Sequence, residues 1–100
     1  MKIIWSLEAV SDLNLIYEFY FKKSPLAALN IYNAIVDETE VLALFPQIAA
    51  VEELLIDLPY AFRSLIVLKR YKVIYRIEKD RIIIDKVWDC RQNPDNLKIE

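Results

Sequence analysis

Three basic side chains are spaced so that they could act together on an anion. Arg63 and Lys72 lie in two successive runs of β-branched and aromatic residues, and Arg91 follows a third run. If two-residue turns join these runs as strands, Arg63 and Lys72 share one sheet face and Arg91 lies a few residues beyond it. Basic groups around one concavity can hold a phosphate and stabilise developing negative charge. We therefore predict that Arg63, Lys72 and Arg91 form a catalytic or anion-binding set.

A plainer interpretation of these cations stays open. Basic residues on strands are common, and most of them are simply solvated. In the same register Arg63 lies directly opposite Arg76, which is unfavourable unless a carboxylate or a bound anion neutralises the pair. A structural ion pair between Arg76 and Asp85 would provide that neutralisation without any ligand.

Missing residue types exclude several kinds of chemistry. The sequence contains no glycine and no histidine, and Cys90 is its single cysteine. Phosphate-binding glycine loops are therefore ruled out, and the usual general base and commonest metal ligand are absent. We expect no cofactor and no metal, and we expect Cys90 to be a small, at least half-buried apolar residue.

Length and composition indicate one soluble domain. A chain of 100 residues can bury one core, so residues 1–100 are expected to form a single domain. The lone cysteine and the lack of a signal-peptide pattern favour the cytoplasm, and no apolar run is long enough to span a membrane. Apolar residues make up 56% of a chain whose net charge is −2, so some apolar surface is expected to meet a partner.

The N-terminal half predicts a strand and two helices. Residues 2–5 are apolar and typical of a strand. Ser6 is a helix cap before an apolar stripe that continues to about Lys22. Ser24 and Pro25 start a second helix, which we expect to end near Phe45 because Pro46 cannot continue it. Two helices joined this closely form an antiparallel hairpin.

The C-terminal half predicts a meander of strands. Residue types and alternation place the strands near residues 54–57, 62–69, 71–78 and 81–88. Two-residue turns would pair Leu68 with Tyr71 and Glu78 with Arg81. One face, with Tyr71, Tyr75 and Trp88 among its members, is then the core, and the polar tail 91–100 is loosely held.

These elements predict an α+β fold with two layers, in the order β-α-α-β-β-β-β. The antiparallel sheet packs on the N-terminal helical hairpin, which covers one of its faces. The chain then has nothing left to cover the opposite face, where the predicted cations lie.

Longer stretches of the sequence resemble the RelE/ParE superfamily of toxins from type II toxin–antitoxin systems. The similarity includes the start WSLEAVSDLNLI, the LFPQ motif at the predicted helix end and the strand YKVIYRI within FRSLIVLKRYKVIYRIEKDRIIIDKVWDCRQNP. It extends over nearly the whole chain. The spacing of the first and third motifs together is specific for the superfamily.

The resemblance implies a cognate antitoxin that covers the active surface, and it leaves the target open. RelE-like members cut messenger RNA on the ribosome with lysine and arginine, and Arg63, Lys72 and Arg91 match positions of their catalytic cations. Leu65 replaces another lysine of that set, and no tyrosine follows Arg91. A ribosome-dependent mRNA endonuclease is the first hypothesis. An inhibitor of DNA gyrase without nuclease activity, as in ParE-like members, is the alternative, and an inactive binding module is a third.

Overall fold

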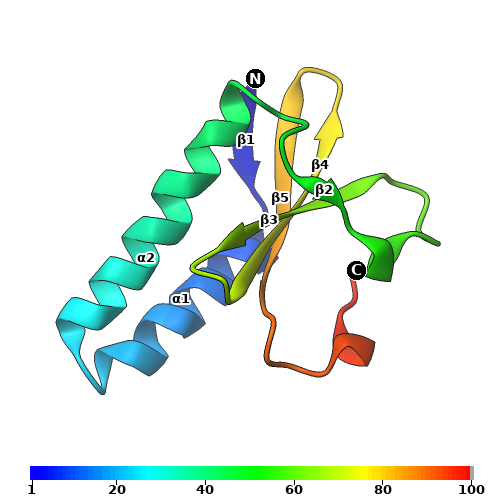
Figure 1. Cartoon of the computed structure of the whole chain (residues 1–100). Coiled ribbons are helices and arrows are strands. Elements are labelled where there is room, and N and C mark those ends of the chain that lie inside the picture. Colours follow the sequence, from blue (N-terminus) through cyan, green and yellow to red (C-terminus); the bar gives the residue numbers. More distant parts are fainter. Residues whose placement is uncertain (100) are drawn as a thin grey trace.

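The chain folds as two helices against one face of a five-stranded sheet (Figure 1). A computed structural model describes residues 1–99, so Glu100 at the end of the predicted tail lies outside it. The elements in chain order are β1 (Lys2–Trp5), α1 (Leu7–Phe21), α2 (Pro25–Thr39), the 3-10 turn η1 (Glu40–Ala43), β2 (Ala50–Val51), the 3-10 turn η2 (Glu53–Leu55), β3 (Phe62–Val67), β4 (Tyr71–Glu78), β5 (Arg81–Asp89) and the 3-10 turn η3 (Pro94–Asn96). The predicted α+β order is confirmed.

Both predicted helix starts are confirmed by their caps. The Ser6 hydroxyl accepts a hydrogen bond from the Ala9 amide at 3.0 Å, and the Ser24 hydroxyl accepts one from the Ala27 amide at 3.1 Å. These bonds satisfy amides that have no partner within the helix. The second helix ends earlier than predicted, because α2 stops at Thr39 and the chain continues to Ala43 as a 3-10 turn.

The sheet order is β1-β5-β4-β3-β2, with β1 parallel to β5 and the other neighbours antiparallel. The predicted strand at residues 54–57 is wrong. Glu53–Leu55 form a 3-10 turn, and the edge strand beside β3 is the earlier pair Ala50–Val51.

The predicted register between β3 and β4 is also wrong by one residue. Val67, and not Leu68, pairs with Tyr71, so three residues form the turn. Leu68 and Lys69 both have φ of 56° in this turn, a conformation that costs about 1–2 kcal/mol for a residue with a side chain. A shift of one residue moves every β3 side chain to the other sheet face. The second hairpin, with Glu78 opposite Arg81, is confirmed.

A β-bulge at Asp85 moves the side chains at the end of β5 to the sheet faces opposite to those predicted. Tyr75 pairs with Ile84 and Ile74 pairs with Lys86, so Asp85 is the extra residue. Beyond the bulge, Val87 packs in the core under the helices, and Trp88 packs on the opposite face. The expected assignment of Trp88 to the helix-covered face is therefore wrong, although Trp88 is buried as predicted.

The helix-covered face holds the larger of two hydrophobic cores. Tyr71 and Tyr75 are buried in it, as predicted. The α1 and α2 stripes contribute Ala9, Leu13 and Ile35. The Tyr75 hydroxyl donates to the Pro46 carbonyl at 2.7 Å, which fixes the loop after α2 against the sheet.

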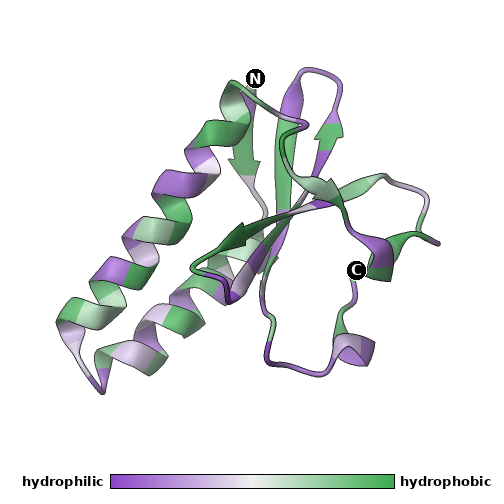
Figure 2. Ribbon diagram, viewed as in Figure 1, coloured by the Kyte–Doolittle hydropathy of each residue, from purple (hydrophilic) through white to green (hydrophobic). Residues whose placement is uncertain are grey.

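The opposite face is covered by the chain itself, so the prediction of a bare face is wrong. A second hydrophobic cluster there contains Leu55, Phe62, Ile74, Trp88 and Leu97, with Ile99 packed against it. The C-terminal tail runs back beside η2, with hydrophilic residues at its turn (Figures 1 and 2). Residues 91–99 are therefore held by apolar contacts at their end, despite their polar composition.

Replacing Leu97 by alanine tests this cover. The Leu97 side chain is 6% exposed, and removing a buried leucine costs about 2–5 kcal/mol. We expect the melting temperature, measured by circular dichroism, to fall by about 4–8 °C for each kcal/mol lost. Leu26→Ala, at a side chain 67% exposed on α2, is the control and should change it little. Equal melting temperatures of the two variants would contradict the docked tail.

Candidate functional site

Arg63 lies on the helix-covered side of the sheet, because it pairs with Tyr75. Its Nη1 donates to the Ala49 carbonyl at 2.6 Å and approaches the Gln47 carbonyl at 3.5 Å. These bonds tie the loop between η1 and β2 to the sheet. The Arg63 guanidinium therefore has a structural role, because it holds this loop against the sheet.

Lys72 lies on the other face of the sheet and forms a largely buried ion pair. Its Nζ is 2.5 Å from Glu52 Oε1, and the same oxygen accepts a hydrogen bond from the Ser64 hydroxyl at 2.8 Å. The second oxygen, Glu52 Oε2, accepts from the Leu54 amide at 3.1 Å and so holds the start of η2. This network closes the segment after β2 over the sheet.

Glu52 is stabilised as a carboxylate by this network. Burial acts to raise the pKa of Glu52, but hydrogen bonds from Lys72, the Leu54 amide and Ser64 outweigh it and hold the pKa below its ordinary value of 4.5. A group whose pKa is lowered by folding stabilises the folded state above its ordinary pKa. This contribution is lost as the pH falls through the lowered value.

Arg91 lies beyond the end of β5, and its side chain is 63% exposed. Its guanidinium contacts the Asp89 carboxylate, with Nη2 2.8 Å from Oδ2 and Nε 3.1 Å from Oδ1. Nη2 also approaches the Tyr20 hydroxyl at 3.4 Å. Of the three predicted site residues, Arg91 is the most accessible to a partner.

The expected convergence of Arg63, Lys72 and Arg91 on one anion is not observed. Arg63 and Lys72 project from opposite faces, because the three-residue turn shifts β3 by one position. Arg91 is near Asp89 and Tyr20 instead. The catalytic roles of the three residues stay predictions. The three side chains do not form one preformed cationic cluster.

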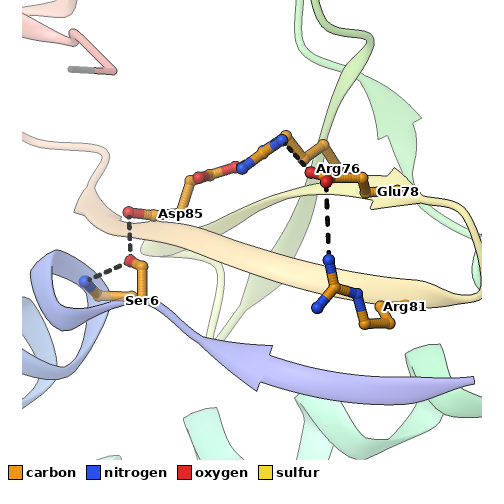
Figure 3. Close-up of polar contacts among 6 residues, drawn as sticks. Ser6, Arg76, Glu78, Arg81 and Asp85 are labelled. Carbon is orange, nitrogen blue, oxygen red and sulfur yellow. Dashed lines mark hydrogen bonds and ion pairs between the residues drawn. The ribbon is translucent and has the colours of Figure 1, made fainter.

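Arg76 forms the structural ion pair that the plainer interpretation anticipated. Its Nε donates to Asp85 Oδ2 at 3.1 Å, and its Nη1 contacts Glu78, which in turn approaches Arg81 (Figure 3). Burial raises the pKa of Asp85, although Arg76 acts against it. The Ser6 hydroxyl donates to the Asp85 carbonyl at 3.1 Å, so the start of α1 is joined to the bulge.

A basic and aromatic group that the sequence did not reveal lies at the β3–β4 turn. The Arg70 guanidinium stacks near the rings of Tyr20 and Tyr71, with its Cζ 4.8 Å and 5.2 Å from their centroids. Arg91 reaches the same Tyr20. Arg70 was assigned only to a turn, and the KRY sequence gives no signal that a distant helix supplies a ring to it.

Two remaining polar features bear on chemistry. No cluster of three carboxylate or thiol side chains in residues 1–99 could hold a metal ion.

Cys90 is exposed, contrary to expectation. The part of its thiol environment that is buried still raises the pKa of the thiol. A raised pKa keeps the thiol protonated and therefore a poor nucleophile.

Glu52→Gln tests the network around Lys72. Leaving the partly buried Lys72 ammonium without its charged partner should cost about 1–3 kcal/mol near neutral pH. Because the Glu52 carboxylate stabilises the fold above pH 4.5, the difference between wild type and Glu52→Gln should shrink on acidification. Unfolding by urea across this pH range measures it. Glu38→Gln, on an exposed position of α2, is the control, and a difference that grows in acid would contradict the network.

The structural roles of Arg63 and Arg91 are separable by substitution to alanine. Arg63→Ala removes two contacts to the loop before β2 and should destabilise the fold by about 1.5–3 kcal/mol. Arg91→Ala should leave the melting temperature nearly unchanged, because the side chain is exposed. Thermal unfolding of both variants compares them. A larger loss for Arg91→Ala would reverse the assignment.

Comparison with solved structures supports the fold. A chain described as "Chromosomal ParDE TA system from P. aeruginosa" superposes with a TM-score of 0.75 and 24% sequence identity, over 89% of this chain and 95% of that chain. At this identity the match shows a shared fold. No curated protein sequence matches this chain significantly.

The sequence also matches a family model. Residues 3–94 match the model described as ParE toxin of type II toxin-antitoxin system, parDE. The matched region includes both helices, β2 to β5 and all of β1 except Lys2, and the two-layer architecture agrees with it. The resemblance to the RelE/ParE superfamily is thereby confirmed: the chain belongs to the ParE toxin family of type II toxin–antitoxin systems.

Proposed function

We propose that this protein is the toxin of a type II toxin–antitoxin pair and that it inhibits DNA gyrase in the cytoplasm without cutting RNA. The single observation that carries the proposal is the ParE family match over residues 3–94. It favours the ParE-like alternative over the RelE-like endonuclease, which the sequence had placed first.

The engagement of the cations supports the same choice. A metal-independent ribonuclease without histidine needs several positive groups preorganised around the reacting phosphate. Here Arg63 is bonded to backbone carbonyls, and Lys72 is paired with Glu52 on the opposite face. Releasing either one would break a contact that holds a loop to the sheet. An inhibitor that works by binding a protein needs no such cluster.

The apolar surface supports a protein partner. Three adjacent large side chains on the loop after η1 are well exposed, namely Leu44, Phe45 and Ile48. Contiguous exposed apolar groups are typical of interaction sites. We propose a cognate antitoxin as the partner that covers such surface and restores growth. No helix among residues 1–99 is long and apolar enough to cross a membrane.

A supercoiling assay with purified gyrase tests the proposal. We expect the protein to block supercoiling of relaxed plasmid and to produce gyrase-dependent DNA breaks, and we expect the antitoxin encoded beside it to suppress both effects. In a reconstituted translation reaction the messages should stay intact. The antitoxin-bound complex is the matched control in both assays.

Cut messages with normal supercoiling would replace the proposal by the RelE-like hypothesis. Alanine variants of Arg63, Lys72 and Arg91 in the translation reaction would then test their catalytic roles. Absence of both activities, with the antitoxin still bound, would support the third hypothesis of an inactive binding module.

A further inference from the structure

The corner where the β3–β4 turn meets the C-terminal half of α1 combines cations, rings and exposed apolar groups. We name it the β3–β4 corner and define it by Leu15, Phe19, Tyr20, Arg70, Tyr71 and Arg91. We propose that this corner binds a protein segment in which a carboxylate side chain stands beside an apolar one. The proposal does not depend on gyrase being the target.

Unpartnered polar atoms gather at this corner. Within residues 1–99, the buried side-chain nitrogen and oxygen atoms without a hydrogen-bond partner are Nε and Nη2 of Arg70 and the hydroxyl of Tyr71. Buried polar groups in folded proteins are nearly always satisfied, so such a group calls for a cause. Nε and Nη2 form the edge of a guanidinium that binds a carboxylate through two parallel hydrogen bonds. The Tyr71 hydroxyl lies beside the Arg70 guanidinium, which acts to lower the pKa of this hydroxyl against the larger effect of burial.

The Tyr20 ring partly covers this edge in the free chain. The Arg70 Cζ is 4.8 Å from the Tyr20 ring centroid, and the Tyr20 hydroxyl is held by a long contact of 3.4 Å to Arg91. The two nitrogens are buried in the free chain, so a carboxylate would reach them only after the Tyr20 or Arg70 side chain rotates. The turn that carries Arg70 is itself strained, because Leu68 and Lys69 have positive φ without being glycine. Strained backbone of this kind is often found at binding sites.

The apolar part of the segment has a place to lie next to these donors. A surface depression of about 300 Å³ is lined by α1 side chains including Leu15 and Phe19, by Tyr20 and Tyr71, and by the ion pair of Arg91 with Asp89. Leu15 is 61% exposed and Phe19 is 53% exposed, although both are large and apolar. An aliphatic or aromatic side chain packed there would remove this surface from water.

The charge of the corner favours carboxylates from a protein over phosphates from a nucleic acid. Lys23, whose Nζ lies 4.5 Å from the Phe19 ring centroid, adds to the positive charge of Arg70 and Arg91, while Asp89 opposes it. The whole chain has a net charge of −2, which disfavours a long phosphate backbone.

A peptide titration followed by NMR tests the proposal on the full chain. The probe is a short capped peptide in which glutamates alternate with leucines, and its control has glutamine in place of each glutamate. We expect saturable shifts of the Arg70 and Arg91 side-chain N–H signals and of the Leu15 methyl groups. Glutamine in the peptide, or Arg70→Gln in the protein, should each weaken binding about tenfold.

Arg81→Gln is the matched control in the protein and should bind as wild type does. Arg81 is also a partly exposed arginine paired with a carboxylate, but it starts β5, at the end of β4 away from Tyr71. If Arg70→Gln does not fold, Arg70→Lys keeps the charge and removes the two-donor edge, and it should weaken binding as well.

Three outcomes would overturn the proposal. The first is no localised shift at millimolar peptide, and the second is equal binding by the glutamine peptide or by Arg70→Gln. The third is stronger binding of a short single-stranded RNA at the same signals, which would assign the corner to nucleic acid. Supercoiling activity is measured separately, so failure here is distinct from failure of the gyrase proposal.

Discussion

The three-residue turn between β3 and β4 determines which side of the sheet each polar side chain of β3 reaches. With Val67 opposite Tyr71, Arg63 faces the helices and Ser64 faces the tail. The turn contains no glycine, so Leu68 and Lys69 adopt positive φ at a cost of about 1–2 kcal/mol each. The gain that offsets this cost is burial on both faces, because the observed register puts Val67 under the helices and Phe62 on the opposite face.

Burial on both faces in turn explains how a small chain with a single cysteine, and so no internal disulfide, holds a five-stranded sheet. One layer of helices would leave Phe62, Ile74 and Trp88 in water. The segment containing Leu55 and the tail containing Leu97 cover them instead. The buried Glu52–Lys72 pair holds the first of these covers and the Leu97 contacts hold the second, so the polar network and the second core depend on each other.

Local signals in the sequence predicted most helices and strands. Which sheet face each side chain lies on depended on contacts between residues distant in the sequence. Ser6, Ser24 and Pro25 mark helix starts through bonds to residues three or fewer positions away, and Glu78 opposite Arg81 needs only a two-residue turn. The β3–β4 turn has no glycine or asparagine to reveal its length. The bulge at Asp85 also has no local sequence signal, because the residues that stabilise it, Ser6 and Arg76, are distant in the sequence.

The difference between local and long-range information also explains why three cations were predicted as site residues and Arg70 was not. Arg63, Lys72 and Arg91 could be found by type and spacing, but spacing does not say whether a neighbouring carboxylate or carbonyl already satisfies a charge. Arg63 and Lys72 are satisfied by Ala49 and Glu52, which belong to the segment whose course was misjudged. Arg70, in the turn whose length was misjudged, has two buried nitrogens without a hydrogen-bond partner among the described residues. Because Arg63 and Lys72 are already engaged in holding loops, an arginine with an unsatisfied edge is where a partner gains more from supplying a carboxylate.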